Sequence, residues 1–150
     1  MKPTITLLAA FTILTLLSRL FFKDWNLLIA GNLSMCLMLF LTASGHFLFT
    51  KGMTMMIPPI IPCKTLLVYL SGLAEVVLGI AILFQSTRFL AGVALIILFL
   101  LLLPANIFAA FKHLNIEKGS YTGPGLAYLW FRVPLQLFFI LWVYVCTIAN

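Results

Sequence analysis

Five long apolar stretches constrain the fold of this chain more than any other feature of its sequence. A helix needs about 20 apolar residues to cross the hydrocarbon core of a bilayer, and continuous runs favour helices over the alternating pattern of barrel strands. The sequence therefore predicts helices at residues 4–22, 27–50, 65–84, 89–111 and 125–148. The first run is the shortest, but Arg19 can extend it by reaching the headgroup region. We expect an all-α transmembrane helical bundle with five spans, in which residues 1–150 form a single domain.

The composition agrees with a location in the membrane. Only 8% of the 150 residues are charged, whereas a soluble domain carries about 25%, and the mean hydropathy is +1.21. The net charge of +6 does not indicate nucleic-acid binding, because the basic residues stand singly at the ends of apolar runs, where they anchor helices at lipid headgroups. We therefore expect the lipid bilayer, and no nucleic acid, as a partner.

The connections between the expected helices are short and define a topology. Three prolines between Lys51 and Lys64 exclude a continuing helix there, and glycines and a proline make residues 112–124 a loop. With five spans, the amino terminus and these two connections lie on one side of the membrane and carry five basic residues. The other side carries three, Arg19, Lys23 and Arg88, so the charge difference favours an amino terminus inside the cell. If the first run does not span, these counts no longer decide the orientation. That run could also be a signal peptide, but no small-residue cleavage site follows it, so we expect it to remain as a helix.

Glu75 points most directly to a functional site, because it lies inside an otherwise apolar run. An ionisable group at that depth costs a few kcal/mol or more, so it faces a partner or a cavity instead of lipid. Ser71, Glu75 and Gly79 follow one another at four-residue spacing on one helix face, and small residues there let a neighbouring helix approach. Glu75 then fixes helix packing through a hydrogen bond or ion pair, contacts a substrate or handles a proton, or lies at a water-filled defect that faces lipid.

The second expected helix carries a matching polar face. Asn32, Cys36, Ala43 and His46 recur at steps that fall on one narrow side of a helix, so this side should point into the bundle. A histidine can be neutral or charged near neutral pH. His46 is therefore either an interfacial residue bonded to water or a group that binds a ligand or exchanges a proton. His46 and Glu75 are the candidate catalytic residues.

Two further polar residues lie in the fourth and fifth runs. Pro104 cannot donate a hydrogen bond to the carbonyl four residues earlier, so we expect it to bend the helix. The nearby Asn106 either joins this bend to another helix or faces a ligand. Arg132 lies within reach of the headgroups and is either an interface anchor or a partner for Glu75. Asn106 and Arg132 complete the predicted binding set, which consists of His46, Glu75, Asn106 and Arg132.

No cofactor motif accompanies this set. Cys36, Cys63 and Cys146 are far apart and form no C-x-x-C pair, and the two histidines, His46 and His113, are too scattered to indicate a haem or metal site. The chain also has no glycine-rich phosphate loop and no H-E-x-x-H motif. We expect Cys36 and Cys146 to be small apolar fillers inside helices and Cys63 to meet solvent. The cofactor stays unknown at this stage, and no metal is predicted.

Several short motifs follow one another in the middle of the chain. They read Gly45-His46-Phe47, Ile57-Pro58-Pro59, Tyr69-Leu70-Ser71-Gly72-Leu73-Ala74-Glu75, Leu78-Gly79, Thr87-Arg88 and Pro104-Ala105-Asn106-Ile107. In this order they resemble the DoxX-like family of small bacterial membrane proteins, over about residues 30–111 and more loosely over the last helix. The resemblance implies a DoxX-type four-helix core between residues 27 and 148. The helix before Leu27 departs from the shorter members and is an added span.

The same resemblance implies a location in the bacterial cytoplasmic (inner) membrane and a range of functions. Some relatives are subunits linked to thiosulfate oxidation and quinone reduction, and others associate with proteins of oxidative-stress defence. We therefore expect a redox-associated membrane subunit that binds a quinone and receives electrons from a membrane or soluble redox partner protein.

Two alternatives remain beside the redox-associated subunit. The bundle is similar to that of eukaryotic sterol-isomerase and sigma-receptor-like proteins, which implies a lipid or sterol-like small-molecule binding or isomerase-type module with Glu75 as acid or cation stabiliser. A fold supports many activities, so this similarity does not decide the function. The second alternative is a structural membrane subunit without catalysis, whose polar groups lock helices together.

Overall fold

The computed structural model describes residues 2–23 and 25–149 of the chain, and the described part is all-helical, without strands. Its helices are α1 (Lys2–Phe22), α2 (Leu27–Leu48), α3 (Thr50–Thr54), α4 (Lys64–Ala81), α5 (Arg88–Phe111), the 3₁₀-helix η1 (Gly125–Tyr128), α6 (Leu129–Val143) and the π-helix η2 (Tyr144–Ile148). Five stretches are long and apolar enough to cross a membrane when η1, α6 and η2 are taken as one span. The all-α prediction with five candidate spans is therefore confirmed.

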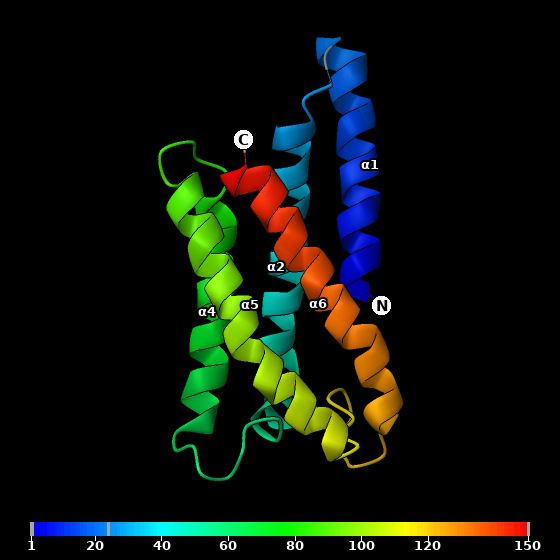
Figure 1. The fold of residues 1–150 in the computed structure, drawn as a ribbon, viewed down its shortest axis with the longest axis vertical. Coiled ribbons are helices and arrows are strands. Elements are labelled where there is room, and N and C mark those ends of the chain that lie inside the picture. Colours follow the sequence, from blue (N-terminus) through cyan, green and yellow to red (C-terminus); the bar gives the residue numbers. More distant parts are fainter. Residues whose placement is uncertain (1, 24, 150) are drawn as a thin grey trace.

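The five long helices run alternately up and down the bundle (Figure 1). α2 lies in the middle and contacts α1, α4 and α6, while α5 packs against α4, α6 and η2. The short α3 and the segments 55–63 and 112–124 lie together at one end, and the turn 82–87 and the end of α1 lie at the other. The connections that carry Lys51, Lys64, Lys112 and Lys118 therefore share one end of the molecule, as alternating spans require.

An apolar core forms where the long helices meet. Its buried side chains are Leu7, Met35, Met38, Leu39, Ile82, Ala91, Leu95, Phe99 and Val143. α2 is the central element, because 50% of its apolar window is buried, against 11% of the window of α1. α1 instead packs on the outside of α2, with Phe11 edge-on to Trp142 of α6 at 4.9 Å between ring centroids. The core therefore belongs mainly to the four later spans.

Several polar side chains of the spans are buried, while large apolar ones cover the outside. The buried polar residues are Thr15, Asn32, Ser34, His46, Glu75 and Thr147. Leu90 and Trp130, by contrast, are 73% and 88% exposed. An unsatisfied polar group in hydrocarbon costs several kcal/mol, so this distribution suits a helical bundle whose outer surface contacts lipid. The inward direction predicted for the polar face of the second helix is confirmed.

Several helix boundaries differ from the predicted ones by a few residues. α2 ends at Leu48, because Phe49 leaves the helical conformation, and the separate α3 follows before the prolines. α4 ends at Ala81 instead of residue 84. In the turn that follows, Thr87 Oγ1 donates a 2.7 Å hydrogen bond to the Ala81 carbonyl. The last span begins as a 3₁₀-helix and finishes as a π-helix. Apolar runs predict where a helix lies, but they do not encode these changes in hydrogen-bond register.

Candidate functional site

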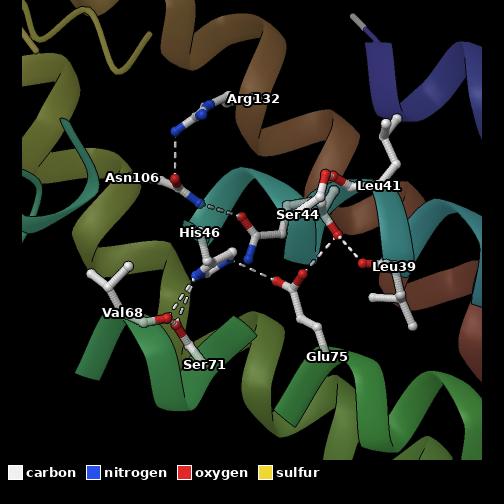
Figure 2. A network of polar contacts seen from close by, with 11 residues as sticks. Leu39, Leu41, Ser44, His46, Val68, Ser71, Glu75, Asn106 and Arg132 are labelled. Carbon is white, nitrogen blue, oxygen red and sulfur yellow. Dashed lines mark hydrogen bonds and ion pairs between the residues drawn. The ribbon is translucent and has the colours of Figure 1, made fainter. Parts of the chain in front are cut away.

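His46 and Glu75 meet between α2 and α4, as Figure 2 shows. Nε2 of His46 lies 3.3 Å from Oε1 of Glu75, and both side chains are less than one tenth exposed. Oε2 of Glu75 accepts a 2.7 Å hydrogen bond from Thr42 Oγ1, which comes from α2, four residues before His46. Both oxygens of the buried acid are therefore partnered by α2.

The second ring nitrogen of His46 contacts α4. Nδ1 lies 3.0 Å from the carbonyl oxygen of Val68 and 3.0 Å from Oγ of Ser71 (Figure 2). Ser71 Oγ also donates a 2.9 Å hydrogen bond to the same Val68 carbonyl. A carbonyl oxygen only accepts, so Nδ1 carries a hydrogen when it bonds to Val68. The ring of a residue on α2 is thus held by α4 at both nitrogens.

These contacts allow His46 and Glu75 to share one proton. When Nδ1 donates to Val68, a hydrogen bond between Nε2 and Oε1 requires one further hydrogen on either of these two atoms. Either an imidazolium faces a carboxylate, or a neutral imidazole faces a carboxylic acid. Both forms have no net charge, which limits the cost of burying ionisable groups. The pair can therefore pass a proton between ring and carboxyl group without changing the charge buried in the span.

Glycines allow α2 and α4 to approach this closely. A Cβ on Gly72 would lie 2.8 Å from Cβ of His46, and a Cβ on Gly79 would lie 3.3 Å from Cδ1 of Leu39. Gly72, Glu75 and Gly79 are spaced by three and four residues, so they share one face of α4. Small residues at this spacing are typical of close helix packing in membranes. The prediction that the Glu75 face meets a neighbouring helix is confirmed.

Asn106 and Arg132 meet in a second cluster, between α5 and α6. The guanidinium of Arg132 donates to Oδ1 of Asn106 (Figure 2). Nδ2 of Asn106 donates a 3.1 Å hydrogen bond to Oε1 of Gln136. Nε2 of Gln136 in turn donates to the carbonyl of Phe99, five residues before Pro104 in α5. Asn106 therefore links the proline-containing part of α5 to α6, which is one of the two roles predicted for it.

The four predicted residues thus form two pairs on two helix interfaces. Glu75 pairs with His46, and Arg132 pairs with Asn106. The alternative pairing of Arg132 with Glu75 does not form, because α4 packs against α2, α3 and α5, whereas α6 packs against α5 and α2. An acid inside a span needs a partner, and the nearest helix supplies it.

Thr42 and Gln136 belong to the two clusters but were absent from the predicted set. Thr42 lies four residues before His46, and Gln136 lies four residues after Arg132. Helical spacing was therefore the signal that could have found them. Their polar groups are only half-buried, as is the Ser71 side chain beside His46. Thr42 and Ser71 are the points at which the buried pair comes nearest to the outer surface.

Two cavities, each of about 390 Å³, lie away from these residues. One lies between α1 and α2, and the other lies at the loop end of the bundle, beside the segment 55–63 and the end of α5. None of the four predicted residues lines either cavity. The polar pairs are therefore packed between helices and do not open into either of these spaces.

The cysteines lie as the sequence predicts. Cys36 is buried, Cys146 is half-buried in the last span, and Cys63 is exposed in the connection before α4. All three are free thiols, and none of them contacts the two polar clusters through a hydrogen bond that the described residues show. Cys36 and Cys146 contribute to packing, and the polar chemistry of the site comes from other residues.

A family match covers residues 35–147. The chain belongs to the DUF8561 family, described as a domain of unknown function. The matched region begins inside α2, omits α1 and contains His46, Glu75, Asn106 and Arg132. No curated protein and no solved structure matches the chain. Family membership therefore delimits the part of the chain that carries both polar clusters, and it assigns no activity to them.

Proposed function

We propose that this protein is a DoxX-like membrane subunit of a quinone-linked redox system, in which the His46–Glu75 pair exchanges a proton with the lipid-soluble substrate. The observation that carries this proposal is the buried pair itself, with 3.3 Å between Nε2 and Oε1 inside two candidate membrane spans. Ionisable residues inside spans typically mark proton relays or ligand sites. Reduction of a quinone takes up protons as well as electrons, so a protonatable pair at this depth suits that chemistry.

The proton and the electrons come from different sources in this proposal. The shared proton leaves Nε2 or Oε1 for a quinone oxygen, and the pair then carries a negative charge until a proton from an aqueous side restores it. Thr42 and Ser71, which are half-buried and contact the pair, are the groups through which this exchange would pass. Electrons come from a membrane or soluble partner protein, because the sequence contains no motif for a redox group.

The DoxX-like architecture is part of the same proposal. Its four-helix core would consist of α2, α4, α5 and the last span, with α1 as an addition and the bacterial cytoplasmic membrane as the location. Two observations support this division. The family match leaves out α1, and only 11% of the apolar window of α1 is buried.

Quinone reduction in membranes tests the proposal. Glu75→Gln keeps the size of the side chain and one oxygen that can accept a hydrogen bond, but its amide group cannot release a proton. We expect it to lower the protein-dependent rate of quinone reduction at least ~100-fold, the lower range for loss of a positioned acid or base. Glu117→Gln makes the same chemical change in the exposed loop after α5 and should leave the rate unchanged. Wild-type membranes that reduce quinone no faster than membranes without the protein would contradict the proposal.

A structural subunit without catalysis is the second candidate, and a specific observation favours it. Both oxygens of Glu75 and both ring nitrogens of His46 already have partners on α2 and α4. If the protein is a structural subunit, Glu75→Gln should change its melting temperature while any activity of the complex survives. Mass spectrometry of an organic extract of the purified protein separates the remaining alternative, because a lipid or sterol-like binding module would carry such a molecule in place of a quinone.

A further inference from the structure

The cavity at the loop end of the bundle lies outside the two polar clusters and has a mixed lining. Cationic and hydroxyl groups come from Lys64, Lys112 and Tyr121, and an apolar wall comes from Met55, Ile57 and Phe108. Its volume of about 390 Å³ falls in the range of small-molecule sites. Charged groups facing an apolar wall match a ligand that has a charged head and an apolar body.

The cavity lies at the depth where two spans end. Lys64 is the first residue of α4, and Lys112 follows directly on the last residue of α5. Both ammonium groups are therefore at the level where the hydrocarbon gives way to lipid headgroups. Nζ of Lys112 lies 5.9 Å from the centroid of the Phe108 ring, so the charge stands directly beside the apolar wall.

Over residues 2–23 and 25–149, no carboxylate forms an ion pair with Lys64 or Lys112. The neighbouring connections add Lys51 and Lys118 at the same end of the bundle, against the single acid Glu117 in the described part of that end. Clustered lysines at a membrane surface attract anionic headgroups.

The walls of the cavity are packed elements. Met56, Ala109 and Leu114 form a buried cluster that joins the segment 55–63, α5 and the loop 112–124. Met55 packs against this cluster and also lines the cavity. The α3 backbone is pressed against the same loop, since a Cβ on Gly52 would overlap the carbonyl group of Ile116. The two lysines are thus presented on a defined surface at the end of the bundle.

We propose that this cavity binds the phosphate headgroup of an anionic phospholipid. The phosphate would accept charge-assisted hydrogen bonds from Lys64 and Lys112 and a further one from the Tyr121 hydroxyl. The glycerol and the upper part of the acyl chain would cover Ile57 and Phe108. A free phosphate would satisfy the lysines but leave this apolar wall uncovered, so the lining favours a lipid over a soluble anion.

Native mass spectrometry of the purified full chain in neutral detergent, titrated with phosphatidylglycerol or phosphatidylcholine, tests the proposal. We expect Lys64→Gln/Lys112→Gln to lower the bound fraction of phosphatidylglycerol about tenfold. Lys51→Gln/Lys118→Gln removes the same charge from the same end without touching the lining and should change binding less than about twofold. Lys64→Arg/Lys112→Arg should keep the lipid, because guanidinium groups also bind phosphate.

Three results would overturn the proposal, provided that circular dichroism shows unchanged helicity in the variants. Equal losses in the two Gln double variants would mean that a diffuse basic surface attracts the lipid. Equal retention of phosphatidylcholine and phosphatidylglycerol by the wild type would mean that the headgroup charge is not read. Displacement of phosphatidylglycerol by inorganic phosphate at equal concentration would mean that the site takes the soluble anion. None of these results depends on the activity of the His46–Glu75 pair.

Discussion

The two polar clusters of this bundle rest on opposite backbone features. The His46–Glu75 pair lies between α2 and α4, where glycines let the helix backbones approach, and it is buried. The cluster of Asn106 and Arg132 lies between α5 and α6, each of which contains a proline, and its side chains are half-buried. Glycine removes side-chain volume between helices, whereas Pro104 removes a backbone donor and so leaves a carbonyl that needs another partner.

The difference shows how burial decides what a charged group needs. Glu75 is buried and therefore requires a partner that pairs with its carboxyl group or hydrogen-bonds to it. Arg132 is half-buried and has a long stem that can reach the headgroup region, so its charge depends less on any single partner within the bundle. The stability of the protein should therefore depend much more on the first cluster than on the second.

Removal of one partner of the buried pair should cause the largest loss of stability. In His46→Leu, Glu75 keeps the hydrogen bond from Thr42 but loses the ring with which it shares a proton. Breaking a buried pair in this way costs roughly 3–5 kcal/mol. We expect the free energy of unfolding to fall by about 3 kcal/mol, as measured by circular dichroism during titration of mixed micelles with SDS.

Two further variants decide whether this loss comes from the unpaired acid. His46→Leu/Glu75→Leu leaves no buried ionisable group, so it should recover roughly half of the loss or more. Arg132→Leu should cost only about 1 kcal/mol, the scale of a hydrogen bond between membrane helices. A larger cost for Arg132→Leu than for His46→Leu would reverse the ranking by burial and break the comparison.

A methyl group at the closest approach of α2 and α4 should give the next largest effect. In Gly72→Ala, the new Cβ would lie 2.8 Å from Cβ of His46, an atom that moves only with its helix. Overpacking of this kind costs about 1–3 kcal/mol, so we expect a loss of about 2 kcal/mol in the same unfolding experiment.

Gly45→Ala is the matched control for Gly72→Ala. Gly45 also lies inside a span, but the atom nearest to its added Cβ would be the flexible Cε of Met53 at 3.6 Å. Alanine is favoured over glycine inside a helix, so this variant should be neutral or gain up to about 1 kcal/mol. Equal destabilisation by the two substitutions would mean that helix backbone effects, and not the contact with His46, set the result.

The sequence predicted which residues point inward, because the helical period alone fixes which side chains share a face. Asn32, Cys36, Ala43 and His46 recur at that period, and all four are buried. Glu75 could likewise be placed inside from the cost of an ionisable group in lipid. These inferences need only one helix and the nature of the solvent around it.

Which faces meet could not be predicted in the same way. The partner of Glu75 depends on whether α2 or α6 packs beside α4, and nothing within the individual apolar runs encodes that choice. The end of α2 at Leu48 and the π-helix after Val143 depend on local hydrogen bonds, which hydropathy does not describe. The loop-end cavity combines residues from three separate segments, so no single motif could point to it.

The smallest effect is expected in the half-buried cluster, from Gln136→Leu. Gln136 accepts a hydrogen bond from Asn106 and donates one to the carbonyl of Phe99, so its loss leaves this carbonyl without that donor. Hydrogen bonds between membrane helices contribute about 0.6 kcal/mol on average. We expect a loss of about 1 kcal/mol for the two bonds, together with faster amide exchange in α5 around the bend.

The effect of Gln136→Leu should stay small because Arg132 can continue to donate to Asn106 and so keep α5 and α6 joined. Gln85→Leu, in the exposed turn after α4, removes the same amide where it links no helices and should be neutral. A loss from Gln136→Leu as large as that from His46→Leu would mean that the proline-containing interface depends on its amides as strongly as the glycine-lined interface depends on its acid. The contributions of the two clusters to stability would then depend on how many helices and backbone groups each cluster links. Burial of charge would no longer explain which cluster contributes more.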